Sequence, residues 1–312
     1  MPDIVIAFFM LGLLAGVVKS DLKVPGQIYE ILSILLMLSI GIKGGLALHS
    51  EYESVVWLNL LAIMGLGLVI PMIVLPLLYK VVKLPKVDAI SIAAHYGSVS
   101  AGTFAVAWAL AESAGLPITA DTTLFLVILE LPAVVLMLAY YHSGRGKSGQ
   151  KANMMAIWYE AFTSRGVILL IGGVAIAWLY GPKGLSSISG LVVDGFKVLL
   201  ALFLLEMGLT TARIFRPLPL AHWRLVVFAA VAPAILMWPG YWLATWLGLD
   251  AGSKLILAAL SGSASYIAAP AAIRAAIPDA DISKAMLASL GVTFPLNVLV
   301  YVPAMTSWLS AS

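Results

Sequence analysis

Long apolar runs separated by short polar turns organise this chain. A helix that crosses a membrane needs about 20 mostly apolar residues, and the turns between these runs carry glycine, proline and lysine, as in Lys23-Val24-Pro25-Gly26 and Gly181-Pro182-Lys183-Gly184. We therefore predict an all-α polytopic membrane protein. The predicted transmembrane helices are about ten: 3–19, 29–48, 54–79, 88–112, 121–141, 164–181, 189–214, 224–248, 252–277 and 284–310.

The composition requires lipid as the solvent for much of this apolar surface. Of 312 residues, 62% are hydrophobic and 11% are charged, and the mean hydropathy is +1.04. A soluble domain is about half apolar and about a quarter charged, so one aqueous core could not bury this much apolar surface. The first run lacks a basic leader, and we expect it to be retained as a span.

The sequence contains no pattern typical of an enzyme or a metal protein. It has no cysteine, which excludes disulfides and thiolate metal sites, and its four histidines are far apart. It contains no Walker loop, no HExxH and no GxSxG. We expect no enzymatic activity and no cofactor. No nucleic-acid partner is expected, because the basic residues are dispersed in short loops.

Lysine and arginine lie almost entirely on one side of the predicted spans. The odd-numbered loops carry fourteen of these residues, whereas the even-numbered loops hold only Lys183 and Lys254. Cytoplasmic loops are enriched in lysine and arginine. We therefore predict a multi-pass protein of the bacterial inner (plasma) membrane with the odd loops in the cytoplasm and both termini outside.

A weak, ordered self-similarity relates the two halves of the chain. Gly97-Ser98-Val99-Ser100 matches Gly262-Ser263-Ala264-Ser265, and two further matches follow at offsets within a few residues of the first. Halves of five helices each must have opposite orientation, which is the inverted repeat of secondary transporters. We predict an N-terminal repeat over 1–141, a cytoplasmic linker over 142–163 and an inverted C-terminal repeat over 164–312.

The fourth and ninth predicted helices are interrupted near mid-membrane by small and polar residues. An unwound helix frees backbone N–H and C=O groups, which then need a ligand or a water-filled cavity. Two half-helix N-termini aimed at one point would attract an anion, although close helix packing is the alternative explanation for such residues. The predicted substrate-binding residues are Gly97, Ser98, Ser100, Gly102, Thr103, Gly262, Ser263, Ala264, Ser265 and Tyr266.

Glu130 lies deep in the fifth predicted helix, two residues before Pro132. A carboxylate within a membrane is energetically unfavourable and usually marks an ion path; a protonated or locally paired carboxylate that only affects packing is the alternative. Lys43 and Glu206 occupy near-equivalent places in the two halves, which suits a structural charge pair as well as a functional one. The predicted sodium-binding residues are Ser98, Ser100, Glu130, Ser263 and Ser265.

Several segments together resemble a known family, the SbtA-type sodium-dependent bicarbonate transporters, over essentially the whole chain. They are Gly41-Ile42-Lys43-Gly44-Gly45, Gly97-Ser98-Val99-Ser100-Ala101-Gly102-Thr103, Leu131-Pro132-Ala133, Glu206-Met207-Gly208-Leu209, Ser263-Ala264-Ser265-Tyr266-Ile267 and Ala269-Pro270-Ala271-Ala272-Ile273-Arg274-Ala275-Ala276-Ile277-Pro278. The resemblance implies core and gate domains, a homotrimer, Na⁺-driven bicarbonate uptake between the broken helices, and a PII-like cytoplasmic regulator. The chain departs from cyanobacterial members at Tyr266, where they carry aspartate, and in its shorter central loop.

The broken helices and the inverted repeat predict a secondary transporter. The resemblance implies that it performs sodium-dependent bicarbonate symport by alternating access, with Na⁺ as the coupling ion. A Na⁺-coupled carrier of another small anion and a Na⁺/H⁺ antiporter that uses Glu130 are alternatives within transport. A non-transporting membrane scaffold or sensor is the alternative of another class, although a scaffold would not need polar breaks at mid-membrane. If a PII-like protein binds, Arg145, Lys147 and Lys151 are its natural electrostatic contacts.

Overall fold

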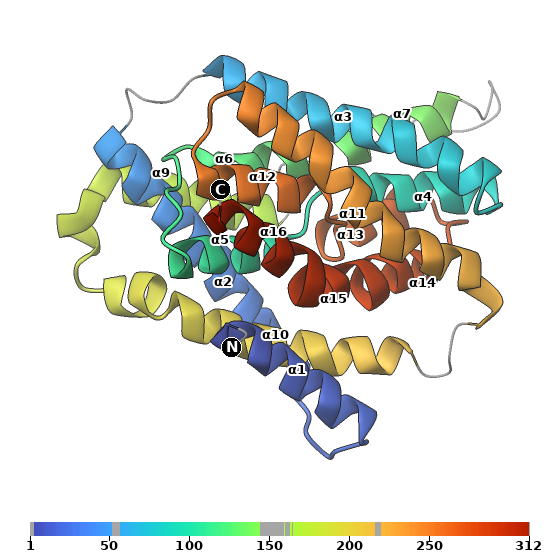
Figure 1. The fold of residues 1–312 in the computed structure, drawn as a ribbon, viewed down its shortest axis with the longest axis horizontal. Helices are drawn as coiled ribbons and strands as arrows, with labels where there is room; N and C mark the ends of the chain where they lie inside the picture. Colours follow the sequence, from blue (N-terminus) through green and yellow to red (C-terminus); the bar gives the residue numbers. More distant parts are fainter. Residues whose placement is uncertain are drawn as a thin grey trace.

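The computed structural model describes residues 3–51, 57–143, 159, 163, 165–215 and 220–311, and within these residues the chain is helical and contains no strand (Figure 1). Most of the predicted linker 142–163, with Arg145, Lys147 and Lys151, lies outside the described residues. Six described helical stretches are long and apolar enough to cross a membrane: Gly26–Ser50, Trp57–Lys80, Thr122–Ser143, Arg165–Leu185, Leu220–Trp246 and Ile282–Ala311. The chain is therefore a polytopic membrane protein, and the count of ten spans in two inverted repeats stays a prediction.

The helices follow the predicted apolar runs. The first half contains α1 (Ile4–Val17), α2 (Gly26–Glu51), α3 (Trp57–Lys80), α4 (Lys86–Gly97), α5 (Ala101–Ser113), α6 (Thr122–Glu130) and α7 (Pro132–Ser143). The second half contains α9 (Arg165–Leu185), a π-helical turn (Gly190–Asp194), α10 (Phe196–Ile214), a 3₁₀ turn (Leu220–His222), α11 (Trp223–Trp246), α12 (Ala251–Ser261) and α13 (Ala268–Ala276). The last predicted run forms α14 (Ile282–Met286), α15 (Phe294–Leu296) and α16 (Val302–Ala311), with π-helical segments at Leu287–Thr293 and Asn297–Tyr301.

Three of the predicted runs are divided into half-helices. The fourth separates into α4 and α5 where Ser98 and Ser100 adopt extended backbone conformations. The fifth separates into α6 and α7 at Leu131, because Pro132 has no N–H to continue the helical hydrogen bonds. The ninth separates into α12 and α13 over residues 262–267. The breaks expected in the fourth and ninth helices are present in the structure.

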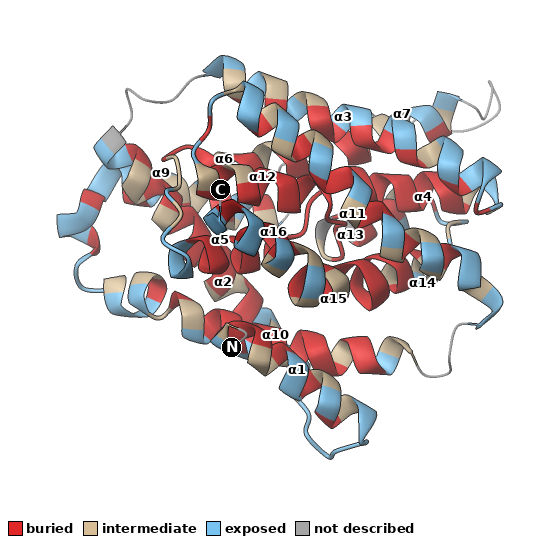
Figure 2. Ribbon diagram, in the orientation of Figure 1, coloured by how far each residue is buried: buried red, intermediate tan, exposed pale blue. Residues whose placement is uncertain are grey.

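The half-helices lie inside the molecule, between longer helices. We call α1, α2, α9 and α10 the four-helix layer, in which α1 packs along α10 and α2 along α9, and we call α3–α7 with α11–α16 the inner bundle. Figure 1 shows α1 and α10 on the opposite side of the half-helices from α3 and α11. Figure 2 shows that α4, α5 and α12 are mainly buried, whereas α3 and α11 present many exposed residues.

Lys43 and Glu206 each form an ion pair with a different residue. Lys43 Nζ on α2 lies 2.6 Å from Glu112 Oε1 on α5 and joins the four-helix layer to the inner bundle. Glu206 Oε1 lies 3.6 Å from Arg213 Nη1 on the same helix. Lys43 and Glu206 therefore do not form a pair with each other.

Small residues allow α1 and α10 to approach closely. A Cβ atom added at Gly12 would collide with the backbone carbonyl oxygen of Leu205, and one at Gly208 would collide with that of Phe9. The glycine-rich face of α1 is therefore used for packing within the chain.

We expect Gly12→Ala to destabilise the protein, because its methyl group would push α1 away from α10. Overpacking of this kind typically lowers the free energy of unfolding by about 1–3 kcal/mol. Gly65→Ala on α3 is the matched control, since nothing lies within 4 Å of the added methyl group and alanine is the better helix former. Thermal unfolding in detergent measures both variants. Equal melting temperatures for Gly12→Ala and Gly65→Ala would contradict the close α1–α10 contact.

Candidate functional site

The two breaks cross each other at the centre of the inner bundle. The backbone N–H of Ser100 donates to Ser263 Oγ at 3.0 Å, and the backbone N–H of Ser265 donates to the His95 carbonyl oxygen at 2.8 Å. Buried backbone groups need such partners, because an unpaired one is costly away from water. Each interrupted segment therefore satisfies part of the backbone of the other.

Two half-helices begin at this crossing, and a serine hydroxyl accepts a hydrogen bond from the first turn of each. Ser100 Oγ accepts from the Thr103 N–H at 3.1 Å at the start of α5, and Ser265 Oγ accepts from the Ala269 N–H at 3.2 Å at the start of α13. The first N–H groups of a helix lack intrahelical partners, and the N-terminus carries a partial positive charge of about half an elementary unit. The crossing thus brings two positive helix ends together.

A small cavity lies between these two helix ends. About 10 Å³ of it is open to the centre of a water molecule, which corresponds to space for roughly one water. The inner bundle supplies most of its lining, and α2 and α9 of the four-helix layer supply one residue each. The lining residues are Met37, Val99, Ser100, Ala101, Leu126, Glu130, Leu170, Ser265, Tyr266 and Ile267.

Glu130 places a carboxyl group at this cavity. It ends α6, and its residue is only 5% exposed. Its Oε2 has no hydrogen-bond partner within the described part of the chain. Its backbone carbonyl, freed by the break before Pro132, accepts from Ser98 Oγ at 2.8 Å. Ser98 therefore fixes the position of Glu130 relative to the first break.

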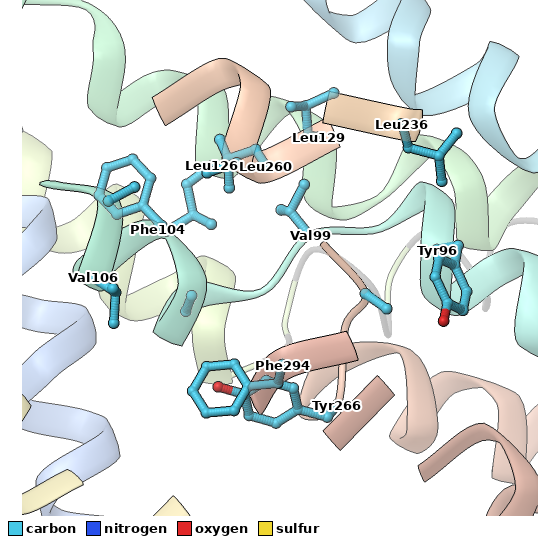
Figure 3. Packing of buried hydrophobic residues seen from close by; sticks show 14 of the residues in the cluster. Tyr96, Val99, Phe104, Val106, Leu126, Leu129, Leu236, Leu260, Tyr266 and Phe294 are labelled. Carbon is cyan, nitrogen blue, oxygen red and sulfur yellow. The ribbon is translucent and has the colours of Figure 1, made fainter. Parts of the chain in front are cut away.

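Tyr266 covers the first turn of α5. Its ring packs edge-on against Phe294, with centroids 5.1 Å apart and an interplanar angle of 64° (Figure 3). Its hydroxyl lies against Gly102 and Ser100, so closely that a Cβ atom at Gly102 would collide with it. Tyr266 therefore limits the space in front of the α5 N-terminus, where an anion would bind.

The structure separates the predicted site residues into two groups. Ser100, Glu130, Ser265 and Tyr266 line the cavity. The other predicted residues lie on or beside the interrupted segments and do not line it. These are Gly97, Ser98, Gly102, Thr103, Gly262, Ser263 and Ala264.

Asn297 is a polar residue of this region that the sequence reasoning missed. Its Nδ2 donates to the Gly262 carbonyl oxygen at 3.0 Å, and its Oδ1 is buried without a partner in the described residues. It thereby supports the second break from the last helical run. The sequence signal that could have identified Asn297 is its polar amide, which lies two residues after Pro295 in an apolar stretch.

Interrupted helices that meet at a small cavity inside the protein are a feature of many secondary transporters. The chain is a member of the Na⁺-dependent bicarbonate transporter superfamily, whose family model matches residues 4–310. A comparison with curated proteins found no match. Membership confirms the resemblance inferred from the sequence and identifies a transporter family, not an enzyme family.

We expect Gly102→Ala to impair the site, because the new methyl group would occupy the position of the Tyr266 hydroxyl. The thermal stability of the protein and its Na⁺-dependent bicarbonate uptake in proteoliposomes should both fall. Overpacking of this kind typically lowers the free energy of unfolding by about 1–3 kcal/mol. Adding Tyr266→Phe removes the nearest colliding atom and should restore part of both. Phe294 Cε2 and Phe203 Cε1 remain at 3.0 and 3.1 Å from the added Cβ, so the rescue should be incomplete. Unchanged stability and uptake in Gly102→Ala would contradict this contact.

Proposed function

We propose that this protein performs sodium-dependent bicarbonate uptake as a symporter. The observation that carries the proposal is the meeting of the α5 and α13 N-termini with Glu130 at one buried cavity. The helix ends suit an anion, and the carboxylate, hydroxyl and freed carbonyl oxygens suit Na⁺. Membership of the superfamily supports both ions as substrates.

Coupling follows from the way in which charge is distributed in this site. No lysine or arginine is among the described residues that line the cavity. Helix ends attract an anion by typically about 0.3–1 kcal/mol, or up to roughly 2 kcal/mol when partly buried. Such an attraction is weak enough for release but too weak for tight binding, so bound Na⁺ supplies the remaining positive charge. Each ion then binds well only with the other.

Alternating access would require movement of the inner bundle relative to the four-helix layer. The cavity has space for about one water, which is too small for bicarbonate and Na⁺ together. At one end of α5, the Lys43–Glu112 ion pair and a 3.0 Å hydrogen bond from Lys197 Nζ to Ser113 Oγ join the bundle to the layer. In the proposed mechanism these contacts separate when the site opens on that side.

The ten-span organisation is part of this proposal. Residues 1–141 would form one five-helix repeat, 142–163 a cytoplasmic linker and 164–312 the inverted repeat. The lysine and arginine bias supports cytoplasmic odd loops and external termini in a bacterial inner membrane. Activity of a cytoplasm-dependent reporter fused after Ser312 would contradict this topology.

A homotrimer and a PII-like regulator are proposed from the family resemblance alone. The regulator would contact the linker residues Arg145, Lys147 and Lys151. The mass of the solubilised particle tests the first proposal, and neutralisation of the three basic residues tests the second. Regulator binding that survives neutralisation would place the contact elsewhere.

We expect Ser100→Ala and Ser265→Ala to reduce uptake of labelled bicarbonate into proteoliposomes with an inward Na⁺ gradient. Both hydroxyls line the cavity and accept a hydrogen bond from an N–H at the start of a helix. For Ser100, which is the N-cap of α5, loss of the cap costs about 0.5–2 kcal/mol. The apparent affinities for Na⁺ and bicarbonate should weaken together. Ser39→Ala is the control, because its buried hydroxyl on α2 has no partner among the described residues. A change in affinity for one ion alone would contradict the shared site.

We expect Glu130→Gln to abolish uptake or its Na⁺ dependence while the protein still folds. The amide keeps the shape of the side chain but cannot supply the negative charge proposed to hold Na⁺. Glu30→Gln is the control, since Glu30 is exposed and lies 4.0 Å from Arg165. Normal Na⁺ activation in Glu130→Gln would remove this residue from the sodium site. Na⁺-driven proton movement in the wild type without bicarbonate transport would favour the antiporter alternative.

A further inference from the structure

An open apolar groove runs between α3 and α11 on the outside of the inner bundle. Its volume is about 520 Å³, within the range of ligand pockets. Figure 1 shows the two helices side by side, and Figure 2 shows many exposed residues along both. Val227, Val231 and Ile235 of α11 are about half exposed in this groove. The apolar side chains that line this groove suit the binding of a hydrocarbon chain.

One end of the groove is basic. Lys83 and Arg224 line the groove and also line a neighbouring hollow of about 420 Å³. Within the described chain neither has an acidic partner. Lys284, which lines the same hollow, lies 2.7 Å from Asp88 Oδ2 and is thereby neutralised. Two positive charges therefore remain available where the apolar groove ends.

The start of α11 is an unfavourable position for a cation that has no counter-ion. Arg224 lies in the first turn of α11, where the positive end of the helix disfavours a cation and favours an anion. An anion placed at this end would interact favourably with both side chains and with the helix N-terminus.

We propose that this groove binds an anionic phospholipid of the surrounding bilayer. Its phosphate lies between Lys83 and Arg224 at the start of α11, and an acyl chain lies along α3 and α11. Trp223, exposed beside Arg224, is a residue type that favours the headgroup level. A basic pocket between membrane helices on the predicted cytoplasmic side fits such a lipid. The proposal does not depend on which ions are transported.

Native mass spectrometry of the full protein with phosphatidylglycerol or phosphatidylethanolamine tests this site. The wild type should retain phosphatidylglycerol in preference to phosphatidylethanolamine. Lys83→Gln with Arg224→Gln should weaken its retention by about thirtyfold, roughly fivefold for each cation. Val231→Trp fills the groove without changing its charge, and it should lower retention of phosphatidylglycerol as well.

A matched control separates this site from general surface charge. Lys19→Gln with Lys23→Gln removes two cations from a loop on the same predicted side of the membrane, and neither residue lines the groove. This variant should retain phosphatidylglycerol as the wild type does. If both double variants lost phosphatidylglycerol equally, the retention would reflect general electrostatic attraction to the protein surface, and the proposal would be overturned. Equal retention of both lipids by the wild type would also overturn it.

Discussion

Backbone hydrogen bonding in a membrane interior constrains this structure more than any other interaction. A continuous helix satisfies its own N–H and C=O groups, whereas an interrupted helix needs partners from elsewhere. Here the Ser100 and Ser265 N–H groups find those partners across the crossing, in Ser263 Oγ and the His95 carbonyl oxygen. Neither break is satisfied without the other, which explains why two segments so far apart in sequence lie together in the most buried part of the bundle (Figure 2).

The distribution of charge follows from the same constraint. Cations are kept away from the cavity, where Lys43 meets Glu112 and where Lys83 and Arg224 remain exposed. The centre is left with helix ends and one carboxyl group, that of Glu130. A site of this kind offers partial charges instead of a fixed counter-ion, which suits a substrate that must leave on the other side.

The sequence predicted those features that depend on local chemistry. Apolar runs placed the helices, and glycine, serine and proline located the breaks before any packing was considered. The sequence could not reveal which side chains meet across the fold: Lys43 pairs with Glu112 instead of Glu206, and Asn297 supports Gly262. It also could not rank the predicted site residues, because cavity lining depends on how α2, α6 and α9 pack around the crossing. The roles of these residues in binding stay predictions.

A site built largely from main-chain groups has an evolutionary consequence. A point substitution cannot delete an N–H group at the start of α5 or α13 unless it introduces proline, so the proposed attraction for anions would survive most changes of side chain. In the proposed mechanism, selectivity would rest on the few side chains that limit the space, above all Tyr266, whose hydroxyl lies against Gly102. Related chains could therefore diverge in the anion they select by exchanging a single residue at this position while the backbone scaffold remains the same.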